Sequence, residues 1–195
     1  MAQTRRGSGP VTIGAMPLPI VTERLVLRAY QDDDLHQLHA VLYSDEAAMR
    51  LLGGPRDLAG TRAALERSMD QQEQGGYSFW PVIERESGLL CGEAGLFPLA
   101  PDGPDVALGY AFGSAYWGRG YATEAATAVV VEAFGAHGMD HLVAITREAN
   151  YGSRRVLTKL GFEEHGLRHV WGAEQLFFTL ARDRAPVLRN PGTRT

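Results

Sequence analysis

Two glycines and an alanine, Gly118, Gly120 and Ala122, alternate with larger residues just before an apolar stretch of helical periodicity. Glycine has no Cβ atom, so backbone N–H groups can converge on a ligand there. The first turn of a helix also leaves its N–H groups without intrahelical partners, at the positive end of the helix dipole. The stretch YWGRGYATEA, residues 116–125, therefore predicts a phosphate-binding site. A tight turn without a ligand is the alternative interpretation.

Two common phosphate-binding patterns do not fit this stretch. The chain contains no GxxxxGK[ST] sequence, which a P-loop requires. The dinucleotide pattern GxGxxG fails because Thr123 stands where the third glycine belongs. Asp140 follows Gly120 by 20 residues, as a ribose-binding acid would, but it precedes the apolar strand HLVAIT instead of ending it. A different phosphate ligand is therefore expected.

The residues around the loop resemble the acyl-CoA loop of the GNAT N-acetyltransferase superfamily, whose signature is Q/R-x-x-G-x-G/A. Gly120 and Ala122 match its small-residue positions, while Trp117 replaces the usual Gln or Arg. That replacement is common in the branch that resembles the ribosomal-protein N-terminal acetyltransferases. The stretches TERLVLRAY (22–30) and NYGSRRVLTKLGF (150–162) agree with the same branch. The resemblance extends from about residue 20 to 182.

This resemblance implies an α/β fold with a GNAT-like mixed sheet, splayed at its centre, of about seven strands with about four helices on both faces. It implies that acetyl-CoA is the co-substrate and that the acetyl group passes directly to a primary amine of a protein N-terminus or a small molecule. Arg119 either contacts the pyrophosphate or faces water. The cofactor residues that it implies are Tyr110, Phe112, Trp117, Gly118, Arg119, Gly120, Tyr121, Ala122, Thr123, Asn150 and Ser153.

The departing thiolate of the cofactor needs a proton donor. Many relatives use a tyrosine seven residues after the Asn of an N-x-x-S/A motif, but Leu157 occupies that position here. The resemblance therefore assigns the role to Ser153, with Asn150 as a ligand of the cofactor arm. Helix capping is the alternative role of both residues. Cys91, the single cysteine, is interpreted as a buried strand residue and not as a nucleophile.

Glu93 is the predicted general base. Many relatives carry an acid two residues before the Gly-Tyr pair of the strand at 105–112, but Ala107 occupies that position. Glu93 is expected in mid-strand, on the same face as Cys91 and Phe97, in a sheet covered on both sides. Burial of a carboxylate is unfavourable without a partner and raises its pKa towards that of a useful base. A core acid without a catalytic role is the alternative.

Hydrophobic periodicity predicts the elements that position these residues. Strands are expected at 24–30, 77–85, 89–99, 105–112, 139–147, 163–171 and 174–181, and helices at 32–52, 58–74, 120–136 and 150–160. Strands and helices alternate in the middle of the chain, which predicts a partly parallel sheet with antiparallel hairpins on either side. One N-acetyltransferase domain is expected over 20–182, between a flexible arm at 1–19 and a tail at 183–195.

The composition of the chain limits which partners and bound groups are expected. The chain has 195 residues and a net charge of −4, so no basic surface for nucleic acid or an anionic membrane is expected. One cysteine excludes an internal disulfide framework and favours the cytoplasm. The six histidines lack metal-ligand spacing, so no metal is expected. Assembly as a homodimer is compatible with the sequence.

The pocket for the amine acceptor is expected to be built from the two early helices, the link between them, two strand residues and the last loop. The residues assigned to this pocket are the link LLGGPRD (51–57), Phe79, Trp80 and the loop at Trp171. A non-catalytic regulator that binds acyl-CoA is the alternative function, since the usual tyrosine is absent.

Overall fold

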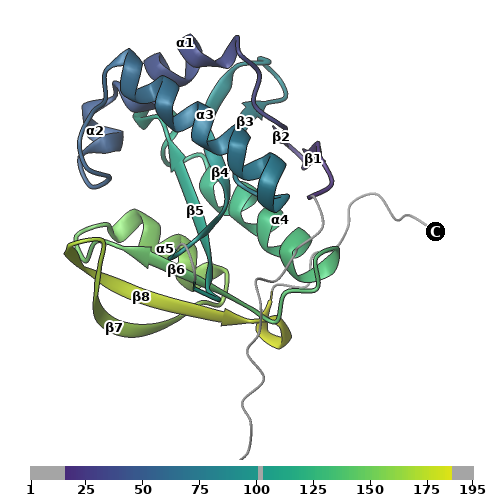
Figure 1. The fold of residues 1–195 in the computed structure, drawn as a ribbon, viewed down its shortest axis with the longest axis vertical. Coiled ribbons are helices and arrows are strands. Elements are labelled where there is room, and N and C mark those ends of the chain that lie inside the picture. The colour runs from purple at the N-terminus through teal and green to yellow at the C-terminus, as the bar shows by residue number, and fades with distance from the viewer. Residues whose placement is uncertain (1–15, 101–102, 186–195) are drawn as a thin grey trace, which may run out of the picture.

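The computed structural model describes residues 16–100 and 103–185, which form one mixed sheet flanked by helices (Figure 1). In these residues the sheet has eight strands in the order β1-β2-β3-β4-β5-β6-β8-β7. The strands are β1 (Ile20–Val21), β2 (Leu25–Leu27), β3 (Phe79–Glu84), β4 (Leu90–Pro98), β5 (Val106–Phe112), β6 (His141–Thr146), β7 (Glu163–Val170) and β8 (Ala173–Ala181). The helices are α1 (Asp34–Leu38), α2 (Glu46–Met49), α3 (Leu58–Gly75), α4 (Tyr121–Gly135) and α5 (Tyr151–Lys159), with short turns η1 (His39–Tyr43), η2 (Ser114–Tyr116) and η3 (Arg182–Arg184).

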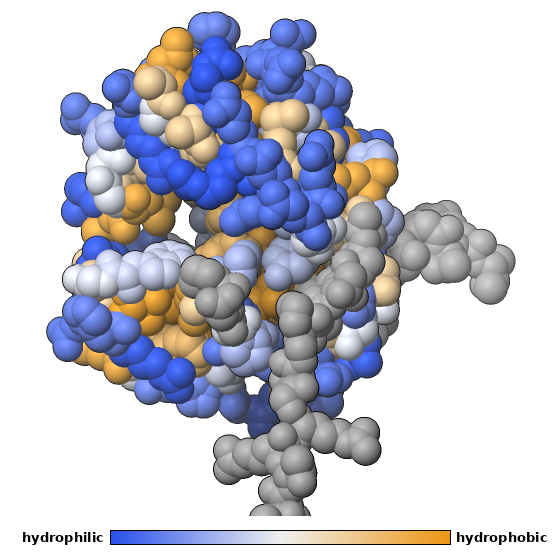
Figure 2. Space-filling model, in the orientation of Figure 1, coloured by the Kyte–Doolittle hydropathy of each residue, from blue (hydrophilic) through white to orange (hydrophobic). Residues whose placement is uncertain are grey.

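The sheet is splayed at its centre, as predicted. Strands β5 and β6 are parallel neighbours, but their register contains one pair, Ala107 with Val143. By contrast, β4 pairs with β5 along the whole of β5, and β6 pairs with β8 along the whole of β6. The molecule therefore has an upper part with β1–β5 and a lower part with β6–β8 and α5 (Figure 1). Figure 2 shows that the surface is hollowed between these two parts.

Helices cover both faces of the upper part. Helix α4 is apolar on most of its surface and buries Ala125, Val129 and Phe134 in the main core with residues of β4 and β8. Helices α1 and α3 cover the opposite face through a second core that contains Leu38 and Leu65. Burial of these apolar side chains is the main force that holds the layers together. The upper part is therefore a three-layer arrangement of helices and sheet, and the hollow lies between it and the lower part.

The helix predicted over 32–52 is not continuous. It is divided into α1, the π-helical turn η1 and α2. Asp45 marks the break, because its side chain accepts hydrogen bonds from the N–H groups of Ala48, at 3.1 Å, and Ser114, at 2.7 Å. Asp side chains compete with helical hydrogen bonds in this way, which favours a new helix start. The break turns the chain towards the splayed end of β5.

A β-bulge at Cys91 changes which face of the sheet the side chains of the following β4 residues point to. Ile83 pairs with Leu90 and Val82 with Gly92, so Cys91 is the extra residue of β4. Cys91 lies in the core on the α4 side, whereas Glu93 faces the side of η1. The expectation that Cys91 and Glu93 share a face is therefore wrong, because a bulge shifts the alternation by one residue.

The ends of the domain are partly described. The predicted arm and tail lie mostly outside the described residues, at 1–15 and 186–195. Residues 16–19 pack on the domain, since Met16 is buried and its N–H donates to the carbonyl of Gly76 at 2.7 Å. At the other end, the N–H of Arg182 donates to the carbonyl of Asp140 at 2.9 Å. No helix in 16–100 or 103–185 is long and apolar enough to cross a membrane.

Candidate active site

The glycine loop ends at the first turn of α4. Gly118 has φ 76° and Gly120, the N-cap of α4, has φ 83°, both in the left-handed region that disfavours side chains. A Cβ at Gly118 would meet nothing within 4 Å, and one at Gly120 would meet only Arg24 Nη2 at 3.4 Å. The loop therefore combines a backbone that requires glycine with open space in front of the free N–H groups of α4.

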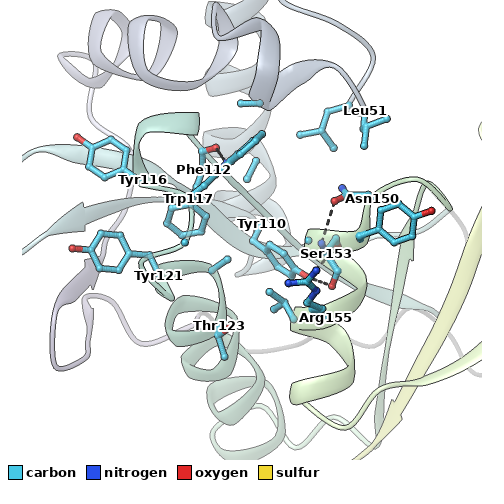
Figure 3. A pocket seen from close by; sticks show the side chains of 18 of the residues that line it. Leu51, Tyr110, Phe112, Tyr116, Trp117, Tyr121, Thr123, Asn150, Ser153 and Arg155 are labelled. Carbon is cyan, nitrogen blue, oxygen red and sulfur yellow. Dashed lines mark hydrogen bonds between the residues drawn. The ribbon is translucent and has the colours of Figure 1, made fainter.

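That space is a cavity of about 630 Å³, here called the loop cavity (Figure 3). Trp117 and Tyr121 lie on one side of it, and Asn150, Ser153 and Arg155 lie on the other. The lining includes ten of the eleven residues assigned to the cofactor from the sequence: Tyr110, Phe112, Trp117, Gly118, Gly120, Tyr121, Ala122, Thr123, Asn150 and Ser153. The structure thus brings three distant segments of the chain to one cavity.

Arg119 is the residue that does not line the loop cavity. Its Nη1 lies 3.6 Å from Glu84 Oε1, and its guanidinium lies 5.3 Å from the centre of the Tyr116 ring. The structure therefore favours the interpretation without a side-chain contact to the phosphates. Three other cations line the cavity and were missed from the sequence: Arg50, Arg155 and Lys159. Arg155 and Lys159 are four residues apart on α5, a spacing that places them on one helix face.

Backbone groups of β5 face the split of the sheet. The N–H of Gly113 donates to the carbonyl of Cys91 at 3.1 Å, so alternate residues of β5 direct their hydrogen bonds to β4. The intervening residues, Tyr110 and Phe112, direct their N–H and C=O groups away from β4. Trp117 Nε1 donates to the carbonyl of Phe112 at 2.8 Å. The N–H and C=O of Tyr110 are therefore placed to pair with an extended ligand in the split.

Asn150 and Ser153 form the first turn of α5. Asn150 is the N-cap, and its Oδ1 accepts a hydrogen bond from the N–H of Ser153 at 3.1 Å. The capping role is therefore present, and Asn150 also lines the loop cavity. Leu157, one turn later, is buried at 1% exposure and has no proton to give.

The hydroxyl of Tyr110 was missed from the sequence. Its oxygen lies 3.0 Å from Ser153 Oγ, and it also donates to the carbonyl of Ser153 at 3.1 Å. Figure 3 shows the two side chains pointing towards one another. Burial raises the pKa of Tyr110 well above its ordinary value, and the hydrogen bond to Ser153 acts in the opposite direction. Tyr110 therefore keeps its proton at neutral pH, next to the hydroxyl of Ser153.

A second cavity, of about 430 Å³, lies between α3 and the split; we call it the α3 cavity. The two cavities share lining residues at the open end of β5 and the start of α5, namely Tyr110, Ala111, Asn150 and Ser153. Two ligands that enter from different sides would thus meet at Ser153. No group of three or more His, Cys, Asp or Glu side chains in residues 16–100 and 103–185 is arranged to hold a metal ion.

Glu93 lines the α3 cavity at 6% exposure. Its Oε2 accepts a hydrogen bond from the hydroxyl of Tyr30 at 2.7 Å, and its Oε1 accepts one from Tyr43 at 2.9 Å. Burial raises the pKa of Glu93, while the two hydroxyls and the charge of Arg56 lower it by smaller amounts. The arrangement is a hydrogen-bonded carboxylate with increased basicity at the floor of a cavity.

Aromatic side chains form one wall of the α3 cavity. The rings of Phe79 and Phe97 are stacked with centroids 5.4 Å apart, and Trp171 lies 5.7 Å from Phe97. A Cβ at Gly109 would lie 2.5 Å from Phe79 Cζ, so glycine makes room for this stack. Phe79 and Trp171 thus line the cavity, as assigned from the sequence.

Trp80, which was assigned to the acceptor pocket from the sequence, does not line the α3 cavity. Adjacent strand residues face opposite sides of a sheet, so Trp80 faces away from Phe79. It is buried at 1% exposure, and its Nε1 donates to Gln72 Oε1 at 2.6 Å.

Residues 24–163 match the family model described as the acetyltransferase (GNAT) domain. The chain belongs to the GNAT acetyltransferase family. The protein YkkB of Bacillus subtilis (strain 168) is 30% identical over 153 residues, which are 78% of this chain and 89% of YkkB. A GNAT-family acetyltransferase from Bacillus anthracis has a TM-score of 0.73 at 22% identity and covers 85% of this chain and 99% of its own.

Another solved structure with the GNAT fold is the ribosomal L7/L12 alpha-N-protein acetyltransferase RimL in complex with coenzyme A. It has a TM-score of 0.72 at 16% identity and covers 86% of this chain and 98% of its own. The likeness at this identity concerns the fold. GNAT members use acetyl-CoA, and the splayed mixed sheet of this chain is the GNAT fold.

Proposed function

We propose that this GNAT protein transfers the acetyl group of acetyl-CoA to a primary amine by direct attack. The meeting of the two cavities at Tyr110, Asn150 and Ser153 carries the proposal. The loop cavity holds the cofactor: the N–H groups of the first turn of α4 bind the pyrophosphate. The C=O of Tyr110 accepts a hydrogen bond from the pantetheine arm, which brings the thioester to Ser153. The acceptor occupies the α3 cavity.

The residues around the meeting point supply the proton transfers. Glu93 accepts the proton of the amine, directly or through a water molecule, so that the neutral nitrogen attacks the thioester carbonyl. The N–H of Tyr110 stabilises the negative charge that develops on the carbonyl oxygen. Ser153 then gives its proton to the departing thiolate as the C–S bond breaks, and the second proton that the attacking nitrogen loses returns to Ser153 through solvent. The hydroxyl of Tyr110 holds that of Ser153 in place.

Cys91 takes no part in this sequence. It is fully buried on the face opposite to Glu93, and burial raises the pKa of its thiol to about 12. A thiolate is the nucleophilic form of cysteine, so an acetyl-cysteine intermediate is not supported. The attack of the amine on acetyl-CoA is direct.

Incubation with acetyl-CoA and a panel of amines tests the proposed function. The panel contains peptides that begin with Ala, Ser or Met and small primary amines, and free CoA thiol and acetylated product are measured together. Equal amounts of both products, above the rate without protein, are expected for at least one amine. Acetyl-CoA binding in calorimetry without thiol release from any amine would instead support the non-catalytic regulator.

Ser153→Ala should lower kcat by about 10-fold, which is below the usual range for general acid catalysis. The loss stays small because the hydroxyl of Tyr110 lies 3.0 Å from Ser153 Oγ and can approach the thiolate in its place. Tyr110→Phe should have a comparable effect, and the double variant should lose more than either single variant. Steady-state kinetics with a fixed amine measure all three.

An acyl donor with a more acidic leaving thiol provides the control, since such a thiolate needs no proton. The Ser153→Ala defect should shrink with this donor. If the defect is the same with both donors, Ser153 positions the cofactor and does not protonate the thiolate.

A further inference from the structure

The residues that line the α3 cavity have a net positive charge, whereas the chain as a whole has a net negative charge. Three arginines line it, Arg56, Arg67 and Arg147, and Glu93 is the one acid among its lining residues. Three positive charges and one negative charge give the lining a net charge of +2, whereas the whole chain has −4. A cavity of one sign in an oppositely charged protein attracts ligands of the other sign.

None of the three arginines forms an ion pair in the described part of the chain, although the charge of Arg56 acts on Glu93. The ion pairs in residues 16–100 and 103–185 involve Arg24, Arg28, Arg119, Arg154, Arg184 and His141. The guanidinium of Arg56 instead lies 4.7 Å from the centre of the Tyr43 ring, a cation–π contact that leaves its N–H donors free.

Separate elements supply these arginines. Arg56 follows α2, Arg67 lies on α3, and Arg147 follows β6 on the other side of the split. Their convergence on one cavity is therefore a property of the tertiary structure and not of a local basic run. Guanidinium groups bind carboxylates and phosphates through paired, charge-assisted hydrogen bonds.

The volume and the other lining residues of the α3 cavity indicate the size and the apolar character of the ligand. Its volume of about 430 Å³ lies in the range of small-molecule sites. The stacked rings of Phe79 and Phe97, with Trp171 beside them, offer an apolar wall. Glu93 offers a partner to an amine, and its single negative charge leaves two of the three arginine charges unbalanced.

We propose that the acceptor is a small primary amine that also carries an anionic group, a carboxylate or a phosphate, bound by Arg56, Arg67 and Arg147. This inference rests on the proposed function, because it names the acceptor class of the same site. In the bound state the amine faces Glu93 and Ser153, and the anionic group lies towards the arginines. An apolar part of the acceptor packs on Phe79.

Binding of matched probes to the full chain saturated with coenzyme A tests the acceptor class. Phenylalanine is compared with phenylalaninamide, and phosphoethanolamine with ethanolamine, so that the two pairs distinguish a carboxylate from a phosphate. The anionic member of at least one pair should bind at least about 10-fold more tightly, the size expected of one charge-assisted hydrogen bond. Titration at a pH at which both amines are protonated removes amine basicity as a cause of the difference within the first pair.

Two variants and a matched control locate the effect. Arg67→Gln and Arg147→Gln should each remove most of the preference for the anionic probe and leave acetyl-CoA binding unchanged. Arg62→Gln, an exposed position on α3 that does not line the cavity, should keep the preference. Acetylation of the probes is followed in parallel through release of CoA thiol.

The outcomes separate this inference from the proposed function. Equal binding within both pairs, preference for the uncharged probes, no binding of any probe, or tighter binding of an acidic peptide would overturn the anionic small-molecule acceptor. If the anionic probes bind through the arginines but no amine is acetylated, the ligand class stands and the proposed transfer fails. If uncharged amines are acetylated as fast as anionic ones in every variant, the transfer stands and this inference fails.

Discussion

Replacing Gly120 with valine should weaken acetyl-CoA binding by at least about 100-fold, because the pyrophosphate loses several hydrogen bonds to backbone N–H groups at once. Gly120 caps α4 with φ 83°, and a β-branched side chain strongly disfavours that conformation. The new side chain would also project into the open space in front of the first turn of α4. Calorimetric titration with acetyl-CoA measures the loss.

Gly88→Val is the matched control for backbone strain. Gly88 lies in the turn between β3 and β4, has φ 71°, and has nothing within 4 Å of the position of a Cβ. Both variants should lose thermal stability to a similar extent, but Gly88→Val should bind acetyl-CoA like the parent. Parental affinity in Gly120→Val would show that the phosphates bind elsewhere.

Replacing Glu93 with glutamine should lower kcat by roughly 100-fold at neutral pH, within the usual range for a general base. The amide keeps the size of the side chain but cannot accept the proton of the amine. The acidic limb of the pH–rate profile should disappear, since that limb reports protonation of Glu93. Acetyl-CoA affinity should not change, because Glu93 lines the α3 cavity and not the loop cavity.

Tyr43→Phe provides the conservative companion variant. The Tyr43 hydroxyl donates to Glu93 Oε1 and lowers the pKa of that carboxylate, so its removal should raise the pKa. The acidic limb should therefore move to higher pH, with activity lost at low pH and recovered as the pH rises. If neither variant changes the profile, Glu93 is a core acid and the amine loses its proton to water.

Local sequence predicted the parts of the site that depend on neighbouring residues. Gly118 and Gly120 predicted a helix start with free N–H groups, because a left-handed backbone before a helix needs residues without a Cβ. The Asn150–Ser153 pair predicted the first turn of α5 for a similar reason, since an N-cap bonds to the N–H three residues later.

Predictions from local sequence were wrong where one residue interrupted the regular alternation of a strand or the regular period of a helix. Strict alternation placed Glu93 on the face of Cys91, and the bulge at Cys91 reversed it. Helical periodicity joined α1 to α2, and the side chain of Asp45 divided them by bonding to Ser114, 69 residues away. A single-residue insertion or one long-range hydrogen bond leaves no periodic signal.

The sequence by itself determined the loop, its helix, the succession of strands and helices along the chain and the position of Glu93 in a buried strand. Only the tertiary structure decided the partners of that carboxylate, since Tyr30 and Tyr43 precede Glu93 by 63 and 50 residues. It likewise decided the contact of Tyr110 with Ser153 and the convergence of three arginines from three elements. The physical reason is that sheet register and the packing of helices on the sheet bring these groups together. Register and packing depend on the burial of apolar side chains over the whole core and not on any one segment.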